Sequence, residues 1–373
     1  MIKQLGLVVL IVATACWPAH GDDEGRVTEI PAIAFRPVVV DAVEHFVLPR
    51  YALLAEKADA EVTALNDLCW QADNERLEAA REGFRALVLA WSGVEMFRFG
   101  PVRDGNRFER LFFWPDPRGR GLKQVQGLLA SRDATATDPD SLRGKSVAVQ
   151  GLVALEFVLF GTGSDVLADK DAADRSHRCG YGAAIAGAIA GTARELSDAW
   201  RGPTGYAALM LEAGEENPIY RSHGEVVQEL VKSCREMVQM DQQLKLAFTI
   251  GETLQDAKPK LAPFWRSNMT IASIRANLAS VVSLCGAEGL GAALPKDSDW
   301  QAGSLAFEIR NADSTLAKVA EDGAPWEDLV TEPKNHDLLA YTRIPLGGAA
   351  ELLEHGYPDA LGLITGFNSL DGD

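Results

Sequence analysis

One charged residue, Glu156, lies within a run of apolar and small residues over positions 147–160, where Gln150 is the other polar exception. The run is long enough for about four helical turns, and a helix that is apolar all round belongs in a protein core. A buried carboxylate without a partner costs several kcal/mol, or its pKa shifts until it is neutral. We therefore expect Glu156 to meet an arginine, hydrogen-bond donors, a metal ion or a ligand.

A second carboxylate, Glu95, follows Trp91 by one helical turn and precedes Arg98 by three residues. If its helix crosses the helix that carries Glu156, the two carboxylates could meet, and the pKa of one of them would then rise. The alternative is that Glu95 ends its helix and pairs with Arg98.

Arginines are concentrated in the loop-rich stretch 98–121, which is also dense in glycine, proline and aromatic residues: Arg98, Arg103, Arg107, Arg110 and Arg118. Long loops in helical domains are uncommon and are often functional. Three of these arginines, Arg98, Arg107 and Arg110, could pair with the carboxylates or bind an anion, and we favour pairing. From the second half of the chain, Arg266 and Arg275 could reach the same cleft, although a solvated or interhelical role is favoured.

Other catalytic patterns are missing from the sequence. There is no H-E-x-x-H, G-x-S-x-G, phosphate-binding or dinucleotide-binding motif. The histidines are scattered, and Glu351 with His355 forms a weak metal pair at helical spacing.

Apolar residues recur at spacings of three and four, which predicts amphipathic helices over residues 36–68, 74–97, 181–200, 219–252, 270–284, 299–319 and 338–353. The helix over 36–68 contains Pro49, which predicts a kink. The helix over 219–252 is expected to bury one row of side chains: Val226, Val227, Leu230, Val231, Met237, Met240, Leu244 and Phe248. Residues 258–268 are expected to form a loop.

No segment alternates like a strand, so the predicted fold is all-α. The breaker Arg201-Gly202-Pro203 suggests two helical bundles, over residues 32–202 and 203–373, with a cleft between them. The second half again consists of long amphipathic helices, which an ancient duplication of the first half would explain.

The chain of 373 residues carries a formal net charge of −17, which argues against nucleic acid and anionic lipid as partners. Its start resembles a signal peptide over residues 1–21, with Lys3, an apolar run over 5–15 and a cleavage pattern that ends at Gly21. The alternative is a lipoprotein anchored through Cys16. Either reading predicts export, to a bacterial periplasm.

Four cysteines then remain in the mature chain, and none belongs to a C-x-x-C pair: Cys69, Cys179, Cys234 and Cys285. An oxidising compartment permits one or two disulfides, with three pairings for two bonds. Buried thiols are the alternative.

Four stretches occur in order along nearly all of the mature chain: Trp91-x-x-x-Glu95, NRFERLFFWPD over 106–116, Gly151-x-x-x-x-Glu156 with the following Phe157-x-x-Phe160-Gly161, and GFNSLDGD over 366–373. Together they resemble the imelysin-like family. The resemblance implies a periplasmic or surface-anchored protein of two helix bundles with a site between them. It also implies a link to iron acquisition or iron regulation, and a founding member described as a metallopeptidase with a G-x-H-x-x-E signature.

At the histidine of that signature this chain has Val153, which has no lone pair to offer a metal. Zinc peptidase sites take three protein ligands and a water, whereas two carboxylates suit a hard cation or iron better. The sequence therefore favours Glu95 and Glu156 as metal ligands, and it discounts peptidase activity.

The leading hypothesis is an exported binding or accessory protein in iron handling. Its ligand would be iron, another divalent cation or a small molecule, and its partners would be periplasmic or outer-membrane iron-uptake proteins. The expected site residues are Trp91, Glu95, Arg98, Arg107, Gly151, Glu156 and Arg275. A metal-dependent peptidase is the alternative, and a structural scaffold is a third class.

Overall fold

The computed structural model describes residues 35–363, and every regular element in that range is a helix. The predicted all-α class is therefore confirmed. The predicted signal peptide over 1–21, the lipoprotein Cys16 and the terminal stretch 366–373 lie outside the described residues.

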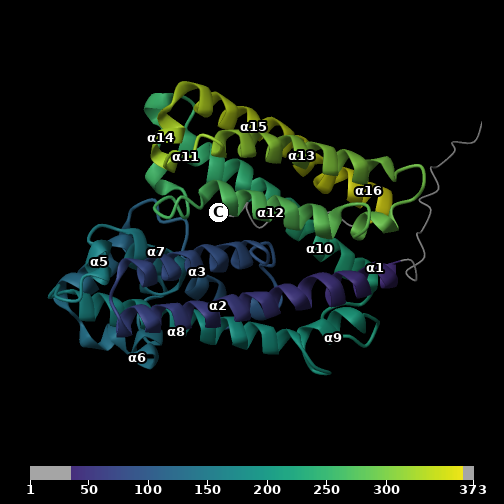
Figure 1. The fold of residues 1–373 in the computed structure, drawn as a ribbon. Helices are drawn as coiled ribbons and strands as arrows, with labels where there is room; N and C mark the ends of the chain where they lie inside the picture. The colour runs from purple at the N-terminus through teal and green to yellow at the C-terminus, as the bar shows by residue number, and fades with distance from the viewer. Residues whose placement is uncertain (1–34, 364–373) are drawn as a thin grey trace, which may run out of the picture.

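The first half of the chain is built on three long helices that lie side by side (Figure 1). One is continuous from α1 (Phe35–Asp41) through a π-helical segment (Ala42–Val47) into α2 (Leu48–Trp70). The other two are α3 (Asn74–Ser92) and α8 (Arg175–Trp200). The π-helical segment directly precedes Pro49, the proline that was predicted to kink this helix, and which has no backbone N–H to donate.

Shorter helices cover the ends of this layer: α4 (Arg107–Leu111), α5 (Arg120–Ser131), α6 (Pro139–Arg143), α7 (Gly151–Phe160) and α9 (Tyr206–Leu211). Figure 1 shows α5, α6 and α7 at one end and α9 at the other. The apolar run over 147–160 is not a single helix as predicted. A 3₁₀ turn (Val147–Val149) precedes the extended Gln150, and α7 then begins at Gly151.

The second half forms the other layer in Figure 1. Its helices are α10 (His223–Gln239), a π-helical segment (Met240–Ala247), α11 (Phe248–Ile250), α12 (Thr270–Cys285), α13 (Trp300–Ala320), α14 (Trp326–Thr331), α15 (Pro333–Glu351), a second π-helical segment (Leu352–Gly356) and α16 (Tyr357–Leu361). The layers touch where α12 packs on α3 and α10 packs on α1. The division at residue 203 and the duplication remain predictions.

The π-helical segment after α10 changes which side chains face the core. The regular helix predicted over 219–252 would bury Leu244 and Phe248, but Phe248 is exposed and Leu244 is only half-buried. The buried residues from Asp241 to Ile250 are Asp241, Lys245, Leu246, Thr249 and Ile250. A π-helix closes on the fifth residue and not the fourth, so every later side chain is rotated around the axis.

Two disulfides settle the cysteine pairing that the sequence left open. Cys69 on α2 is bonded to Cys179 on α8, and Cys234 on α10 is bonded to Cys285 on α12. Each bond therefore joins two helices of one layer. Among the described helices, one stretch, Thr270–Ala293 with α12, is long and apolar enough to cross a membrane, but 61% of it is buried by neighbouring helices. A helix in the core of a folded protein has the same length and apolar composition.

Candidate functional site

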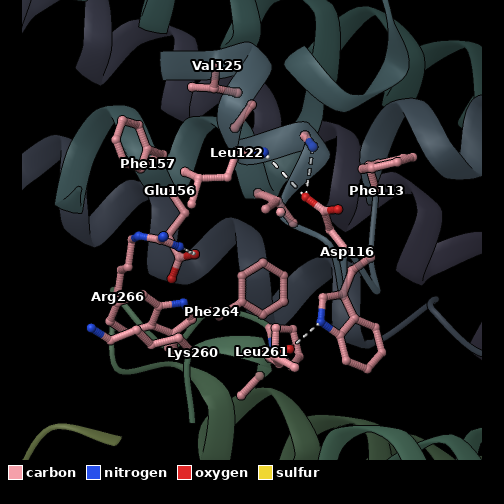
Figure 2. A pocket seen from close by; sticks show the side chains of 18 of the residues that line it. Phe113, Asp116, Leu122, Val125, Glu156, Phe157, Lys260, Leu261, Phe264 and Arg266 are labelled. Atoms are coloured by element: carbon pink, nitrogen blue, oxygen red, sulfur yellow. Dashed lines mark hydrogen bonds and ion pairs between the residues drawn. The ribbon is translucent and has the colours of Figure 1, made fainter. Parts of the chain in front are cut away.

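A cavity of about 220 Å³ lies where the two layers meet at the α5 and α7 end. Two helices and two loops line most of it: the helices α5 and α7, the loop over residues 113–119, and the loop that leads into α12. Figure 2 shows Glu156 and Arg266 together on one side of the cavity and Asp116 on the other. Leu122 and Val125 lie above them in this view.

Glu156 projects from α7 into this cavity, and its side chain is 1% exposed. Its Oε1 accepts a hydrogen bond from the backbone N–H of Ser267 at 2.9 Å and another from the Ser267 hydroxyl at 2.9 Å. The guanidinium of Arg266 lies 4.0 Å from its Oε2. Burial raises the pKa of Glu156, and the contacts with Ser267 and Arg266 oppose this shift. The sequence predicted a buried acid that needs partners, and these are the partners.

Gly151 sets the position of α7. Its φ is +74°, in the left-handed region that favours glycine, and a Cβ there would lie 2.4 Å from the carbonyl oxygen of Arg110. Only glycine therefore lets α7 begin this close to the end of α4. The helix then points Val153 and Glu156 into the cavity, so the position of the family's histidine faces the same space as its glutamate.

The wall opposite α7 lies in the segment 258–268, which was predicted as a loop. Phe264 has a φ of +59°, an outlier for a bulky side chain that costs roughly 1–3 kcal/mol. Its ring is buried and stacks on Phe112 with centroids 5.3 Å apart, which offsets that cost. From the first half of the chain, Trp114 donates its indole N–H to the carbonyl of Leu261 at 2.9 Å. These contacts hold the two walls together.

Asp116 lines the cavity but is already engaged. Its Oδ1 accepts the backbone N–H of Arg120 at 2.9 Å, and its Oδ2 accepts that of Gly121 at 2.8 Å and that of Leu122 at 3.4 Å. These are the free amides at the start of α5, where a negative charge is favourable. Asp116 therefore holds α5 in place against the loop.

Arg266 is held by aromatic rings. Its guanidinium carbon lies 4.3 Å from the ring centre of Trp265 and 5.4 Å from that of Phe157, and its side chain is 15% exposed. Nζ of Lys260 also lies over the Trp265 ring, 5.6 Å from its centre, and pairs with Glu327 at 3.2 Å. Two cations thus border the cavity beside an indole face.

Glu95 belongs to a separate, sealed cluster between the layers. It lies in the turn after α3 and is fully buried, and its Oε2 accepts hydrogen bonds from Lys245 Nζ at 2.8 Å and from Asn277 Nδ2 at 3.2 Å. Lys245 also donates to Asn277 Oδ1 at 2.7 Å and lies 3.1 Å from Asp241. The cluster therefore joins Glu95 of the first half of the chain to three residues of the second half, Lys245, Asn277 and Asp241.

Charges in this cluster have shifted pKa values. Burial raises the pKa of Asp241 to about 7, although Lys245 opposes the shift. Burial lowers the pKa of Lys245, but the nearby Asp241 and Glu95 outweigh it, so that the net shift is upward. Sequence reasoning missed Lys245 and Asp241. The regular helix predicted over 219–252 turned Leu244 and Phe248 inward and not Lys245, which the π-helical segment places in the core.

The other predicted site residues are dispersed. Trp91 is buried against Phe108 and Phe112, and its indole N–H has no hydrogen bond within the described chain. Arg98 lies over the Phe108 ring and borders a second cavity. Arg107 pairs with Glu195 and donates to the carbonyl of Pro101, and Arg275 pairs with Asp313 at 2.6 Å. Neither Arg107 nor Arg275 lines the cavity at Glu156, because each is held by partners within its own half.

The residues at the cavity do not fit a bare metal ion. Val153 offers no lone pair, Oε1 of Glu156 is taken by Ser267, and its Oε2 faces a guanidinium. Residues 35–363 contain no group of three or more His, Cys, Asp or Glu side chains placed to hold a metal. Glu95 and Glu156 have separate partners, and no hydrogen bond or ion pair joins them. A metal site shared by Glu95 and Glu156 stays a prediction, and the separate positions of the two carboxylates do not support it.

Comparisons with known proteins agree on the fold. The structure of an imelysin-like protein from Psychrobacter arcticum 273-4 matches with a TM-score of 0.74 and 21% identity, over 91% of this chain and 98% of that one. A protein described as an iron-regulated protein A precursor, from Parabacteroides distasonis ATCC 8503, matches with a TM-score of 0.71 and 12% identity, over 90% and 97% of the two chains. No curated protein matches the chain.

The family assignment rests on the sequence match. The family model described as Imelysin matches residues 47–344, which is most of the chain and includes α7, the loop before α12 and both disulfides. The chain belongs to the imelysin family.

Proposed function

We propose that this protein is an exported binding or accessory protein in iron handling, and that it binds its ligand in the cavity at Glu156. Export is supported by the signal-like sequence over residues 1–21 and by the word precursor in the name of the Parabacteroides relative. The link to iron is supported at the level of the family by the same relative, which is described as iron-regulated.

One observation carries the proposal: Val153 and Glu156 of the family signature face a single cavity that both halves of the chain line. A concave, mostly apolar pocket with a few convergent polar groups is the usual form of a small-molecule site. A peptidase is disfavoured, because a catalytic zinc needs three protein ligands and the signature position has valine.

The peptidase alternative is tested by restoring the histidine. Wild type, Val153→His and Glu156→Gln would be purified, their metal content measured, and casein cleavage assayed with added zinc. We expect wild type to hold no stoichiometric zinc and to cleave no casein. Zinc at one equivalent in wild type, together with cleavage that Glu156→Gln abolishes, would establish the peptidase instead.

The role in iron handling is tested in cells. The gene would be deleted in its host, and uptake of radioactive iron measured under iron limitation with wild type, Arg266→Gln or Arg275→Gln restored. We expect wild type and Arg275→Gln to restore uptake and Arg266→Gln, which changes a side chain that lines the cavity, to fail. Arg275 is the matched control, since its ion pair with Asp313 lies outside the cavity. Unchanged uptake in the deletion strain would refute the proposal.

A further inference from the structure

We propose that the cavity at Glu156 binds a small aromatic carboxylate, with the carboxylate on the guanidinium of Arg266 and the ring between the aromatic walls. This inference rests on the proposed function for its location, and it names the class of ligand.

Arg266 carries donors that make no hydrogen bond within the described chain. A guanidinium has five N–H donors in a planar fork that matches a carboxylate. Within residues 35–363 the guanidinium of Arg266 makes no hydrogen bond, and its one ion pair, with Oε2 of Glu156, is 4.0 Å long. The guanidinium also lies over the rings of Trp265 and Phe157. Its side chain is 15% exposed and lines the cavity, so these donors are available to a ligand there.

The other charged groups around the cavity already have partners. Asp116 accepts three backbone amides of α5, Oε1 of Glu156 accepts both donors of Ser267, and Lys260 pairs with Glu327. An entering anion therefore meets donors on Arg266 that make no hydrogen bond. An entering bare cation would meet Arg266 and Lys260, both positive, and a single carboxylate oxygen without a hydrogen bond, Oε2 of Glu156.

The residues that line the cavity and the volume of the cavity indicate the chemistry of the rest of the ligand. Aromatic side chains surround the cavity from both halves of the chain: Phe113, Trp114, Phe157, Phe264 and Trp265. Such rings bind a flat aromatic ligand by offset stacking or edge contacts. The volume of about 220 Å³ lies below the range of about 300–1,000 Å³ typical of drug-sized ligands, so we expect a ligand of about one substituted ring.

Iron can be carried by this class of ligand. A benzoate with an ortho hydroxyl group chelates ferric ion through its carboxylate and phenolate oxygens, which are hard donors suited to iron. The cavity would then recognise the organic anion, and no protein side chain would be required to coordinate the metal.

Isothermal titration calorimetry on the full mature protein tests the ligand class. Benzoate is the probe, benzyl alcohol keeps the ring without the charge, and acetate keeps the charge without the ring. We expect benzoate to bind at one site, and both controls to bind at least tenfold more weakly.

The role of Arg266 is tested by Arg266→Met, which keeps an unbranched apolar side chain against Trp265 and Phe157. We expect this change to weaken benzoate binding by roughly tenfold to a hundredfold, the effect of losing charge-assisted hydrogen bonds. The matched control is Arg275→Met, on α12, which should bind benzoate as wild type does. Thermal melts of both variants show whether each is folded.

Two results would overturn the inference: benzyl alcohol binding as tightly as benzoate, or folded Arg266→Met binding benzoate as wild type does. If Arg266→Met does not fold, Arg266→Lys provides the measurement, since it keeps the charge but loses the fork. The inference then predicts benzoate binding at least tenfold weaker than in wild type, and unchanged binding would count against it.

The ligand class and the link to iron can fail separately. The same titration would be repeated with 2-hydroxybenzoate, its ferric complex and ferric chloride. If benzoate binds and the ferric complex does not, the aromatic carboxylate stands as the ligand class, but iron is not carried with it. Binding of ferric chloride alone, with no binding of benzoate, would refute the aromatic carboxylate and leave the role in iron handling standing.

Discussion

Glu95 and Glu156 are both buried acids at the contact between the two layers, yet their surroundings differ. Glu95 is met by Lys245 and Asn277 inside a sealed cluster, and Lys245 is itself fully buried. Glu156 borders a cavity, and the cation beside it is a guanidinium that forms no hydrogen bond with the described chain. Burial alone therefore does not identify a binding site. The distinguishing feature is a cavity next to donors that the protein leaves unused.

Under the function proposed above, the first cluster stabilises the fold and the second binds the ligand. A buried ion pair contributes little net stability over an apolar replacement, but removal of one partner leaves the other charge unpaired and is strongly destabilising. The cluster at Glu95 joins the turn after α3 to α12 and to the π-helical segment after α10. It therefore links the first half of the chain to the second.

The largest expected effect is that of Lys245→Met. This change leaves Glu95 and Asp241 buried without their cation, and we expect it to lower the free energy of unfolding by about 3–5 kcal/mol. Urea unfolding followed by circular dichroism measures the loss. A loss below about 1 kcal/mol would contradict the view that the cluster links the two halves.

The matched control for Lys245→Met adds Glu95→Gln and Asp241→Asn to it, so that no charge remains unpaired. We expect this triple variant to recover most of the lost stability, because the penalty comes from the unpaired carboxylates. A triple variant as unstable as Lys245→Met would show that packing of the lysine stem, and not charge, causes the loss.

Glu61 on α2 extends the comparison of buried acids, because it is fully buried and forms no ion pair within residues 35–363. It is fully buried, neither carboxylate oxygen has a hydrogen bond within the described chain, and burial raises its pKa well above its usual value. It lies against Gly83 of α3, where a Cβ would come within 2.2 Å of Oε2. The folded state therefore keeps the proton on Glu61 at a pH where the unfolded chain has already lost it.

Stability should therefore fall as the pH rises above the unfolded pKa of Glu61, by about 1.4 kcal/mol for each unit between the two pKa values. Glu61→Gln does not titrate, so its melting temperature relative to wild type should rise between pH 4 and pH 8. Glu56→Gln, at an exposed site on the same helix, serves as the control and should show no such trend. An identical pH trend in Glu61→Gln and wild type would mean that Glu61 does not hold its proton.

The smallest expected effect is that of Glu156→Gln on stability. The amide keeps an oxygen that can accept from Ser267, so we expect a change in the free energy of unfolding of less than about 1 kcal/mol. Urea unfolding beside Lys245→Met gives the comparison directly. Equal losses of unfolding free energy in Glu156→Gln and Lys245→Met would contradict the view that the two buried acids have different roles.

Much of the fold follows from the sequence, because apolar spacing of three and four is a direct signature of helices packed on a core. The exceptions lie where one residue changes the backbone locally. Gly151, at a positive φ, separates α7 from the 3₁₀ turn before it, and the π-helical segment after α10 turns Lys245 inward. Neither a single glycine nor a π-helix leaves a periodic signal.

Only part of the candidate site was predictable from the sequence. An acid in an apolar helix indicates burial, and Arg266 could be considered as a cation from the second half. Ser267 could not be foreseen, since its main contact is through a backbone amide, which every residue but proline possesses. Glu95 was assigned to the cavity because sequence spacing cannot tell which of two buried acids faces open space.

The two disulfides have a consequence for how a ligand would enter. Cys69–Cys179 and Cys234–Cys285 each close a loop inside one layer, and no covalent bond other than the main chain crosses from α7 to the loop before α12. The cavity walls are thus each crosslinked within their own half and are joined to each other by non-covalent contacts. For a ligand to enter between them, contacts such as the hydrogen bonds of Trp114 and Ser267 would have to break, while both disulfides stay intact.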